Sequence, residues 1–429
     1  MTEKELHLRY LEEKSMIERY GHISVITYEE WKVIKIMKTI KNTIGNEVKV
    51  FAETFENEAY EQVKTLASFE PYQNAKIRIM PDSHAGKGCT IGTTMTIADK
   101  ITPNLVGVDI SCGILVVELQ EREIDLKELD MVIHEHIPSG FNIHLIPIHS
   151  FNFDNLRCSK HVNLERAILS IGSLGGGNHF IEVDKSKDGG LYLVIHSGSR
   201  NLGVGVCSYY QNLAYEKLNS MADKKKELIE SLKAQGREKD INSELRKLQQ
   251  PKFCKELAYV EGQDFEDYIN DMEIVQQFAS LNRKTIAELI VGYMGWHIND
   301  RFETIHNYID TKNMILRKGA VSAQKGEKFI VPINMRDGSL ICIGKGNDDW
   351  NYSAPHGAGR LMSRSKAKET ISMNEYKDAM SDIYTTSVND STIDEAPQVY
   401  KPIEEIMQAI EPTAEIVEVI KPIYNYKAN

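Results

Sequence analysis

Asp109 and Cys112 lie three residues apart in residues 104–113, which read NLVGVDISCG. A carboxylate is a hard oxygen ligand and a thiolate is a soft sulfur ligand, so together they suit divalent transition metals. A thiolate can also bridge two cations, and the nearby carboxylate can complete the coordination of one of them. Taken alone, a D-x-x-C pattern is common by chance and favours a plainer interpretation, a buried cysteine in an ordinary hairpin with an aspartate in its turn.

Two histidines are predicted at the ends of strands beside glycine turns. His179 follows the glycine cluster 175–177 and leads into a strand, and His196 ends the apolar run 191–195. Rigid sheets present ligands to a cleft at such positions. A third histidine, His306, is expected at the far end of a helix over 264–301.

These residues together offer five ligands with one sulfur that can be shared. Such a set suits two adjacent divalent ions, and carboxylate, imidazole and thiolate ligands accept Mn²⁺, Zn²⁺, Co²⁺ or Fe²⁺. The expected metal ligands are Asp109, Cys112, His179, His196 and His306.

The elements that must position these ligands are read from the pattern of apolar residues. Apolar runs on both sides of the D-x-x-C turn predict a pair of strands, and residues 76–80 predict a strand that ends at Pro81. Further strands are predicted at 48–51, 314–323, 328–334 and 340–343. A helix over 361–369 would place His356 near a helix N-terminus.

Strand-rich blocks surround one helical excursion at about 206–305, and this arrangement predicts an α+β fold. The excursion includes the charge-dense residues 222–250, in which mixed charges predict a solvated helical hairpin. Residues 1–45 are polar and helix-prone, and we interpret them as an appended segment.

Composition predicts a soluble globular protein. The 429 residues are 26% charged and 41% hydrophobic, with a net charge of −11. No stretch approaches the roughly 20 consecutive apolar residues that a membrane-spanning helix needs. The charged N-terminus lacks the apolar core of a secretory signal, so we expect a cytoplasmic protein without a membrane partner.

The cysteine pattern argues against two further classes, and the charge disfavours nonspecific binding of nucleic acid without excluding an enzyme that acts on RNA ends. Six cysteines without a CxxC pair argue against a disulfide framework and against a zinc finger. A net negative charge gives no general attraction to nucleic acid, so a polyanionic partner would need a strong local basic surface.

Seven blocks of the sequence resemble, in order, those of the RtcB family of RNA ligases: MPDSHAGKG, GVDISCG, GGGNHFIEV, HSGSRNLG, IHN, RKGA and APHGAGR. The resemblance implies one large RtcB-like ligase domain over 46–429. It also implies an enzyme that joins RNA ends bearing a 3′-phosphate or 2′,3′-cyclic phosphate to ends bearing a 5′-hydroxyl, in RNA repair or tRNA splicing. Members of the family use GTP and two Mn²⁺ ions and pass through a histidine–GMP intermediate.

The resemblance also implies roles for individual residues. His356, in APHGAGR, would be the nucleophile, and the five ligands named above would hold the metals with Cys112 shared. The nucleotide contacts would be Asn178, Glu182, His356 and Lys427. Candidates for binding phosphate or RNA are Asp82, Arg200, Lys318 and Arg360.

Several of these residues also fit structural roles. Glu182 fits an outward-facing strand residue, and Arg200, Lys318 and Arg360 fit structural ion pairs. Asp82 fits a residue that orients an attacking hydroxyl or a metal ligand.

Two positions depart from the family pattern. Family members commonly have glycine where Ser111 stands, and residues 332–338 read PINMRDG where many relatives have a glycine-serine nucleotide loop. These departures predict a divergent branch of the family, in which GTP preference and the RNA substrate are the properties most open to change.

Two other functions fit the same residues. One is a metal-dependent RNA-end phosphoesterase or cyclic-phosphate hydrolase, which would process ends without GTP and without a joined product. The other is a non-enzymatic RNA-binding or damage-sensing protein with structural metals, which would have no need of His356. An archease-like activator is a possible partner of the ligase.

Overall fold

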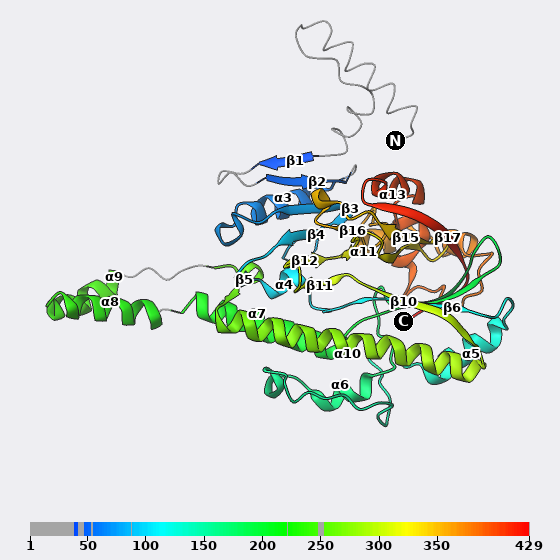
Figure 1. Ribbon diagram of the computed structural model, residues 1–429, viewed down its shortest axis with the longest axis horizontal. Coiled ribbons are helices and arrows are strands. Elements are labelled where there is room, and N and C mark those ends of the chain that lie inside the picture. The colour runs from blue at the N-terminus through cyan, green and yellow to red at the C-terminus, as the bar shows by residue number, and fades with distance from the viewer. Residues whose placement is uncertain are drawn as a thin grey trace, which may run out of the picture. The chain divides into compact units, whose positions relative to one another are not determined.

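The computed structural model of the chain describes residues 38–41, 47–52, 55–86, 88–220, 222–247 and 253–428 (Figure 1). Most of the segment 1–45, interpreted above as appended, lies outside the described residues. Helices and strands are mixed along the described chain, and the predicted α+β fold class is confirmed.

The packing of the backbone divides the chain into two compact units. The first unit combines the described residues of Met1–Thr96 with Val183–Gly190 and Gly319–Asn425. The second unit combines Ile97–Glu182, Leu191–Lys318 and the described residues of Tyr426–Asn429. Each unit is therefore assembled from segments that are far apart in sequence.

One set of strands in the first unit contains β1 (Lys38–Lys41), β2 (Glu47–Val50), β3 (Ile77–His84) and β4 (Ile91–Thr96). β2 runs parallel to β3, while β1 pairs with β2 and β3 with β4 in antiparallel fashion. The crossover between β2 and β3 is α3 (Asn57–Ala67), which buries Val63 and Leu66 on one face.

A second set of strands in this unit contains β14 (Lys328–Asn334), β15 (Gly338–Gly344) and β17 (Ala414–Lys427), whose last two residues belong to the second unit. β15 is antiparallel to both of the others. The helix α13 (Ile403–Ile410) contributes Ile406 and Ile410 to the same core cluster as Phe329 and Leu340. An apolar helix face thus covers the apolar face of a hairpin.

The remaining elements of the first unit lead to His356. β13 (Ala320–Ser322) pairs antiparallel with β16 (Ser353–Pro355), and Ala320 lies opposite Pro355. Gly319 and His356 therefore flank the same end of this short pair. The helices α11 (Arg364–Thr370) and α12 (Met373–Ala379) follow later in the chain.

The second unit is built around three antiparallel strands in the order β10 (Ile298–Ile305), β6 (Gly113–Leu119) and β8 (Leu191–Ser197). In their register Gly113 lies opposite both Ile305 and Ser197. This register brings the residues next to Gly113, Ile305 and Ser197 to one end of the three strands.

Helices accompany these strands. The long helix α10 (Gln263–Met294) lies beside α7 (Arg200–Leu218) and also contacts α5 (Leu126–His136) and β8 (Figure 1). α6 (Leu164–Ser170) packs against α7. The other elements are α4 (Pro103–Val106), β5 (Lys100–Ile101), β7 (Phe180–Lys185), β9 (Val260–Glu261), β11 (Asn307–Asp310) and β12 (Ile315–Lys318).

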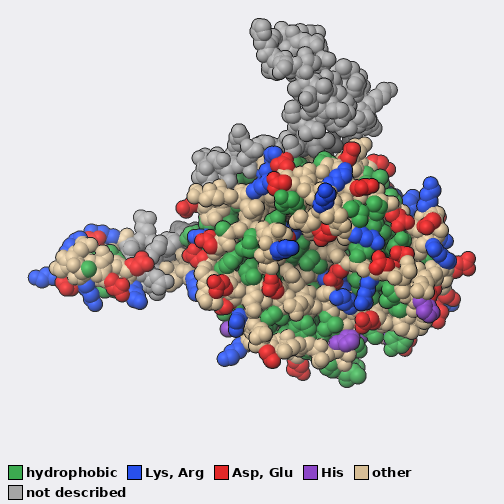
Figure 2. All heavy atoms as spheres, viewed as in Figure 1, with side chains coloured by type: hydrophobic (Ala, Val, Ile, Leu, Met, Phe, Trp, Pro, Cys, Tyr) green, Lys and Arg blue, Asp and Glu red, His purple; other side chains and the backbone are tan. Residues whose placement is uncertain are grey.

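The charged excursion contains α8 (Ala222–Ala234) and α9 (Ile241–Lys247), which pack on each other. α9 buries no residue, and side chains of both signs cover this part of the molecule (Figure 2). The predicted solvated hairpin is present, although the whole span 206–305 is not helical, since it also contains β9 and β10.

Two strand predictions are wrong. The run before Asp109 forms the one-turn helix α4 and not a strand, because Pro103 begins a helical turn that Gly107, at φ 112°, ends. β3 continues through Pro81 to His84, and the register of its pairing with β4 shifts between Ile79 and His84. A proline is tolerated where the ladder is interrupted in this way.

The positions of two histidines also differ from the prediction. α10 ends at Met294 and is capped by Gly295 in the left-handed region, so His306 follows strand β10 and not the helix. α11 begins only at Arg364, and His356 directly follows strand β16.

The described residues include no helix long and apolar enough to cross a membrane. On the face seen in Figure 2, acidic and basic side chains are interspersed, so this face shows no continuous basic surface.

Candidate functional site

The five predicted metal ligands meet at one end of the three strands of the second unit. Cys112 directly precedes β6, His196 lies near the end of β8, and His306 directly follows β10. Asp109 lies in the turn between α4 and β6, and His179 directly precedes β7. The strand register, described above, is what brings these positions together.

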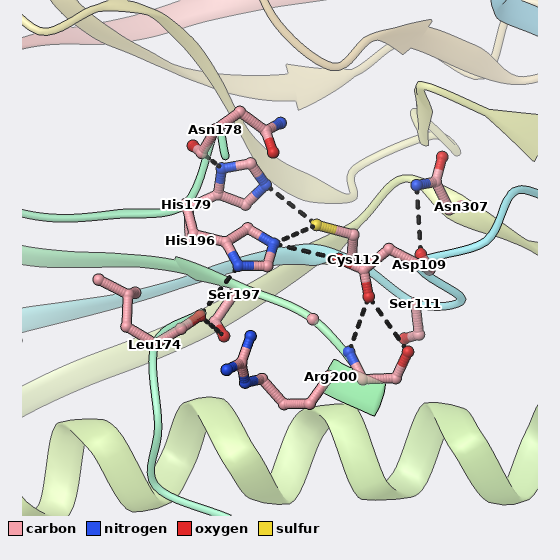
Figure 3. A network of polar contacts seen from close by, with 12 residues as sticks. Asp109, Ser111, Cys112, Leu174, Asn178, His179, His196, Ser197, Arg200 and Asn307 are labelled. Carbon is pink, nitrogen blue, oxygen red and sulfur yellow. Dashed lines mark hydrogen bonds and ion pairs between the residues drawn. The ribbon is translucent and has the colours of Figure 1, made fainter. Parts of the chain in front are cut away.

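The ligand atoms converge on the sulfur of Cys112 (Figure 3). The Cys112 Sγ lies 3.3 Å from Nε2 of His179 and 3.3 Å from Nε2 of His196. Nε2 of His196 is 3.4 Å from Nε2 of His306, and Nε2 of His179 is 3.1 Å from Oδ2 of Asp109.

The five residues form two overlapping groups that share Cys112. One group is Cys112, His196 and His306, the other is Asp109, Cys112 and His179, and within each group the ligand atoms lie within 4.8 Å of one another. We call these five residues the cysteine-centred cluster.

Backbone carbonyls fix the orientation of two of the imidazoles. Nδ1 of His179 donates to the carbonyl oxygen of Leu174 at 2.9 Å, and Nδ1 of His196 donates to that of Asn178 at 3.1 Å. With Nδ1 facing a carbonyl, Nε2 is the ring nitrogen that faces the sulfur and that would coordinate a cation after losing any proton it carries. This is the usual arrangement around metal-binding histidines.

The metal-free cluster holds one charged and one neutral acid. Burial alone would raise the pKa of Asp109, but the hydrogen bond and attraction from His179, with hydrogen bonds from Cys112 and Ser199, lower it to about 2. Burial and the charge of Asp109 raise the pKa of the Cys112 thiol well above its usual value, and Arg283 opposes this rise. A cation must therefore displace the thiol proton when it binds.

Two buried residues of α10 hold the loops that carry the ligands. Nη1 of Arg283 donates to the carbonyl oxygen of Ser111 at 2.8 Å and to that of Ser197 at 2.7 Å. Ser111 directly precedes Cys112, and Ser197 directly follows His196. Nε of Arg283 donates to Glu303 at 2.7 Å. Arg283 thus ties together all three strands at their ligand-bearing end.

Asn282 acts on the glycine-rich loops. Its Oδ1 accepts hydrogen bonds from the backbone of Gly172 and Ser173, and its Nδ2 donates to Ser173, Ser197 and Gly198. This fully buried amide fixes the loop before His179 against the loop after His196.

The turn around Asp109 requires close approach and an unusual backbone. A Cβ at Gly198 would lie 2.2 Å from Oδ1 of Asp109, so only glycine leaves room for this carboxylate. The carboxylate accepts hydrogen bonds from N and Oγ of Ser199 at 3.0 and 3.2 Å. Ser111, where the resemblance leads us to expect glycine, has a φ of 58° in the left-handed region.

The donor set of the cluster fits divalent metals. Three imidazoles, a sulfur and a carboxylate face one another in this site, and nitrogen, sulfur and oxygen donors of this kind bind divalent transition metals. One sulfur between two groups suits a pair of ions.

A second set of predicted residues meets in the first unit. Nδ1 of His356 lies 2.6 Å from Oδ2 of Asp82, which also accepts the backbone N–H of His356 and of Gly357, both at 3.1 Å. Because this carboxylate oxygen only accepts, Nδ1 of His356 donates its proton to it, and Nε2 is the nitrogen on the opposite side of the ring. We call these two residues the His356–Asp82 pair.

The surroundings of the pair explain two sequence blocks. A Cβ at Gly319, in RKGA, would lie 3.1 Å from Cε1 of His356 and 2.3 Å from Ile91, so glycine makes room for the imidazole. His84, in MPDSHAGKG, contacts the Asp82 carbonyl through Nδ1 at 3.1 Å. Burial lowers the pKa of His84. The hydrogen bond to the Asp82 carbonyl raises this pKa and the nearby His356 lowers it further, with a net lowering, so His84 is a neutral neighbour of the pair.

Two of the basic residues proposed to bind phosphate make contacts within the protein. Lys318 is buried and donates to the carbonyl of Asn104 at 2.8 Å. Arg360 donates to the carbonyl of Asp394 at 2.6 Å and to Glu395 at 3.4 Å, and it lies over the ring of Tyr400. Lys318 and Arg360 thus both make contacts of the structural kind, the alternative that the sequence analysis gave for them.

Arg200 and the nucleotide candidates differ in exposure. Arg200 borders a cavity that also reaches Asp109 and His179. Asn178 is exposed, whereas Glu182 and Lys427 are buried.

Sequence reasoning missed Arg283, Asn282 and Ser199. The first two lie inside a long helix, where polar residues at helical spacing look like any solvated face. Ser199 lies inside the block HSGSRNLG, and its position directly after Gly198 is the sequence feature that could have indicated a role in the site.

The fold and the site define a class of protein, an α+β protein with a cysteine-centred cluster of metal-ligand type and a histidine oriented by an aspartate. The family model described as tRNA-splicing ligase RtcB matches residues 62–163 and 149–428. These matches cover most of the chain, and the chain belongs to the RtcB family. The resemblance seen in the sequence blocks is confirmed.

Three relatives illustrate the similarity. The RNA-splicing ligase RtcB of Escherichia coli strain K12 is 29% identical over 391 residues, which cover 81% of this chain and 89% of the relative. The tRNA-splicing ligase RtcB of Aeropyrum pernix is 26% identical, with coverages of 83% and 89%. That of Methanococcus maripaludis is 25% identical, with coverages of 82% and 87%.

Proposed function

We propose that this protein is a GTP-dependent RNA ligase that joins 3′-phosphate or 2′,3′-cyclic phosphate ends to 5′-hydroxyl ends through a guanylylated His356. The relatives named as RNA-splicing or tRNA-splicing ligases support the RNA ligase class. GTP, two Mn²⁺ ions and the histidine–GMP intermediate are the parts of the proposal that follow from the family resemblance and the site chemistry.

The observation that carries the proposal is the state of His356. Its Nδ1 is held at 2.6 Å by a fully buried carboxylate, so Nε2 presents a lone pair in a fixed direction. A nucleophile with its second nitrogen oriented by an acid is the arrangement that nucleophilic catalysis requires.

In the proposed reaction Nε2 of His356 attacks the α-phosphorus of GTP. A P–N bond forms, the P–O bond to the β-phosphate breaks, and pyrophosphate leaves. Asp82 stabilises the imidazole as positive charge develops on it. An oxygen of the RNA 3′-phosphate then attacks the same phosphorus, and the electron pair of the P–N bond returns to the imidazole. The RNA 5′-hydroxyl finally attacks the activated 3′-phosphate and releases its proton to solvent, and GMP leaves. A 2′,3′-cyclic phosphate end must first be opened by water, which breaks the P–O2′ bond and gives the 3′-phosphate.

Asp109, Cys112, His179, His196 and His306 are the residues that would hold the divalent ions. Bound there, the ions supply positive charge for phosphate oxygens whose negative charge increases in the transition state. The backbone carbonyls on His179 and His196 keep these two imidazoles in the tautomer that metal binding needs.

The nucleotide and phosphate roles are proposals of the same kind. Asn178 would donate to phosphate, and the carboxylate of Glu182 would accept from guanine N–H groups, with Lys427 beside the base. Arg200 retains an Nη1 that donates to none of the described residues. Among the basic candidates it is therefore the one best suited to a phosphate, and Arg360 and Lys318 would act mainly through the contacts described above.

A metal-dependent phosphoesterase would use the cysteine-centred cluster alone. It has no need of an imidazole with one nitrogen fixed by a buried carboxylate, and the His356–Asp82 pair therefore favours the ligase. An archease-like activator is compatible with either reaction.

The test is covalent labelling with GTP that carries ³²P in the α-phosphate, in the presence of Mn²⁺. We expect the wild type to take up one guanylyl group, measured by intact mass, and His356→Ala to take up none. The bond should break in acid and survive alkali, as a phosphoramidate does.

His149→Ala is the matched control, since His149 is an exposed histidine of the second unit. Its label should equal that of the wild type. Label retained on His356→Ala would reject the nucleophile, and an unlabelled wild type that still removes RNA end phosphates would favour the phosphoesterase.

A further inference from the structure

A cavity of about 1020 Å³ in the second unit opens beside the cysteine-centred cluster. Its lining includes Asp109 and His179, the loop around Phe141, and the two arginines Arg166 and Arg200. The cavity therefore leads from the surface of this unit to two of the metal-ligand candidates.

Phe141 is an unusual surface residue. Its side chain is 94% exposed although it is a large aromatic group at the rim of a cavity. Exposed aromatic rings at the edge of a polar cleft are the platforms on which unpaired bases stack.

The loop that carries Phe141 is held rigidly by the two arginines. Nη2 of Arg166 donates to the carbonyl of Phe141 at 2.7 Å, and Nη2 of Arg200 donates to the carbonyl of Gly140 at 2.8 Å. The N–H of Gly140 donates to the carbonyl of Gly175 at 2.8 Å. The exposed ring thus stands on a fixed backbone and not on a loose loop.

The cavity is basic in a chain of net charge −11. Its lining contains two arginines and two histidines but only one acidic residue, Asp109. Burial lowers the pKa of Arg200, Asp109 opposes this, and the like charge of Arg166 adds to it. Two guanidinium groups that repel each other beside one cavity provide the local positive charge that a polyanion needs to overcome the charge of the whole chain.

We infer that this cavity binds an unpaired nucleotide at the end of an RNA strand, with Phe141 stacking on the base and Arg166 and Arg200 binding its phosphate. This inference rests on the proposed function for the identity of the polymer, and it deepens that function by adding a base platform and a second arginine. A free 5′-hydroxyl end and a 3′-phosphate end share this chemistry, and the experiment separates them.

The experiment measures binding of the full-length protein, with Mn²⁺ and without GTP, to two single-stranded RNA oligonucleotides by fluorescence anisotropy. One oligonucleotide has a free 5′-hydroxyl end and the other a free 3′-phosphate end, each with the dye on the opposite end. We expect Phe141→Ala to weaken binding of at least one oligonucleotide roughly 30-fold, the middle of the range for one stacked base. The strand that is affected identifies the end.

A base-free terminal nucleotide distinguishes stacking from a structural effect. In the wild type its introduction should weaken binding about as much as Phe141→Ala does. In Phe141→Ala it should have no further effect, because the platform is already gone. Additive losses would overturn the stacking role.

Arg166→Ala tests the phosphate contact. We expect weaker binding for all base sequences and a salt dependence reduced by about one phosphate contact. Leu145→Ala is the matched control, because Leu145 is 97% exposed on the same loop but does not line the cavity. Unchanged binding of both oligonucleotides to Phe141→Ala and Arg166→Ala, or an equal loss in Leu145→Ala, would overturn the inference.

Failure of the inference is distinguishable from failure of the proposed function. Guanylylation of the wild type by GTP alone involves no RNA, so its absence rejects the nucleophile whatever the oligonucleotides do. Normal guanylylation combined with RNA binding that is indifferent to Phe141 and Arg166 rejects the cavity and retains the ligase.

Discussion

In the cysteine-centred cluster, His179 and His196 are each oriented by their own backbone carbonyl, whereas in the His356–Asp82 pair one carboxylate oxygen does all of the orienting. The cluster is further supported by Arg283 and Asn282, which bond to the loops and not to the ligands. The pair has a single acid that reaches both the imidazole and the backbone around it.

This difference suits two kinds of chemistry. A metal site needs several ligands fixed at once, and distributing the support over many backbone groups protects the geometry as a whole. A nucleophile needs one nitrogen with a lone pair, and one acid on the opposite nitrogen is sufficient. Substitutions in the two regions should therefore affect different measurements.

The largest effect is expected for Cys112→Ala. It removes the one atom that both ligand groups share, so both metals should be lost and ligation should fall by more than about 100-fold, the upper range for changes around metal ligands. Metal content after dialysis measures this. Cys342→Ala removes a buried cysteine of the first unit and should keep its metals; two metals retained in Cys112→Ala would show that the sulfur is not shared.

Asp82→Asn should act on the pair alone. The neutral amide no longer stabilises positive charge on His356 and no longer enforces its tautomer, so the rate of guanylylation should fall on the order of 10²- to 10⁴-fold. Metal content should stay at the wild-type level. Asp378→Asn, at an exposed aspartate, serves as the control, and a loss of metal in Asp82→Asn would contradict the separation of the two regions.

Arg283→Met should act on the cluster alone. The side chain is fully buried, and its loss removes the donor that the carbonyls of Ser111 and Ser197 and Oε1 of Glu303 share, so metal affinity should fall about 10- to 100-fold. Isothermal titration of the metal-free protein with Mn²⁺ measures this. Arg317→Met is closely matched, because Arg317 is also fully buried and pairs with Asp310. A similar loss of affinity in both variants would show general destabilisation and not support of the metal site.

Ser111→Gly should give the smallest effect, and it should be favourable. Ser111 has a left-handed backbone, φ 58°, and its buried hydroxyl makes no hydrogen bond, so glycine should stabilise the metal-free protein by about 1 kcal/mol. Thermal unfolding measures the gain. Ser339→Gly also removes a buried unbonded hydroxyl, but from strand β15, and should destabilise. A gain in Ser339→Gly equal to that in Ser111→Gly would assign the effect to the hydroxyl.

Local sequence patterns predicted much of the framework. Alternating or continuous apolar runs gave β8 and β14 nearly as the structure has them, because both strands are buried and end at turn residues. The same logic failed for α4, where four residues from Pro103 form a helical turn that an apolar pattern cannot distinguish from a strand. It also failed at Pro81, where a shift of register lets the strand continue.

The site was predictable as a set of residues but not as an arrangement. Residue type and position beside turns single out the five ligands, and the structure brings them together because of the register of β10, β6 and β8. The role of Asp82 depends on its approach to His356, 274 residues away in sequence, and no local pattern encodes such a contact. The same holds for Arg283 on α10, whose partners Ser111, Ser197 and Glu303 lie 172, 86 and 20 residues away in sequence.

The amide of Asn282 has a consequence for the order of events during assembly. Because it joins the segments before His179 and after His196 through five hydrogen bonds, both segments take their final form once α10 has docked. A divalent ion that binds to the cysteine-centred cluster would then enter a preformed site, and little of its binding free energy would be spent on ordering the polypeptide. Chelation should accordingly leave a folded apoprotein that reloads without first having to refold.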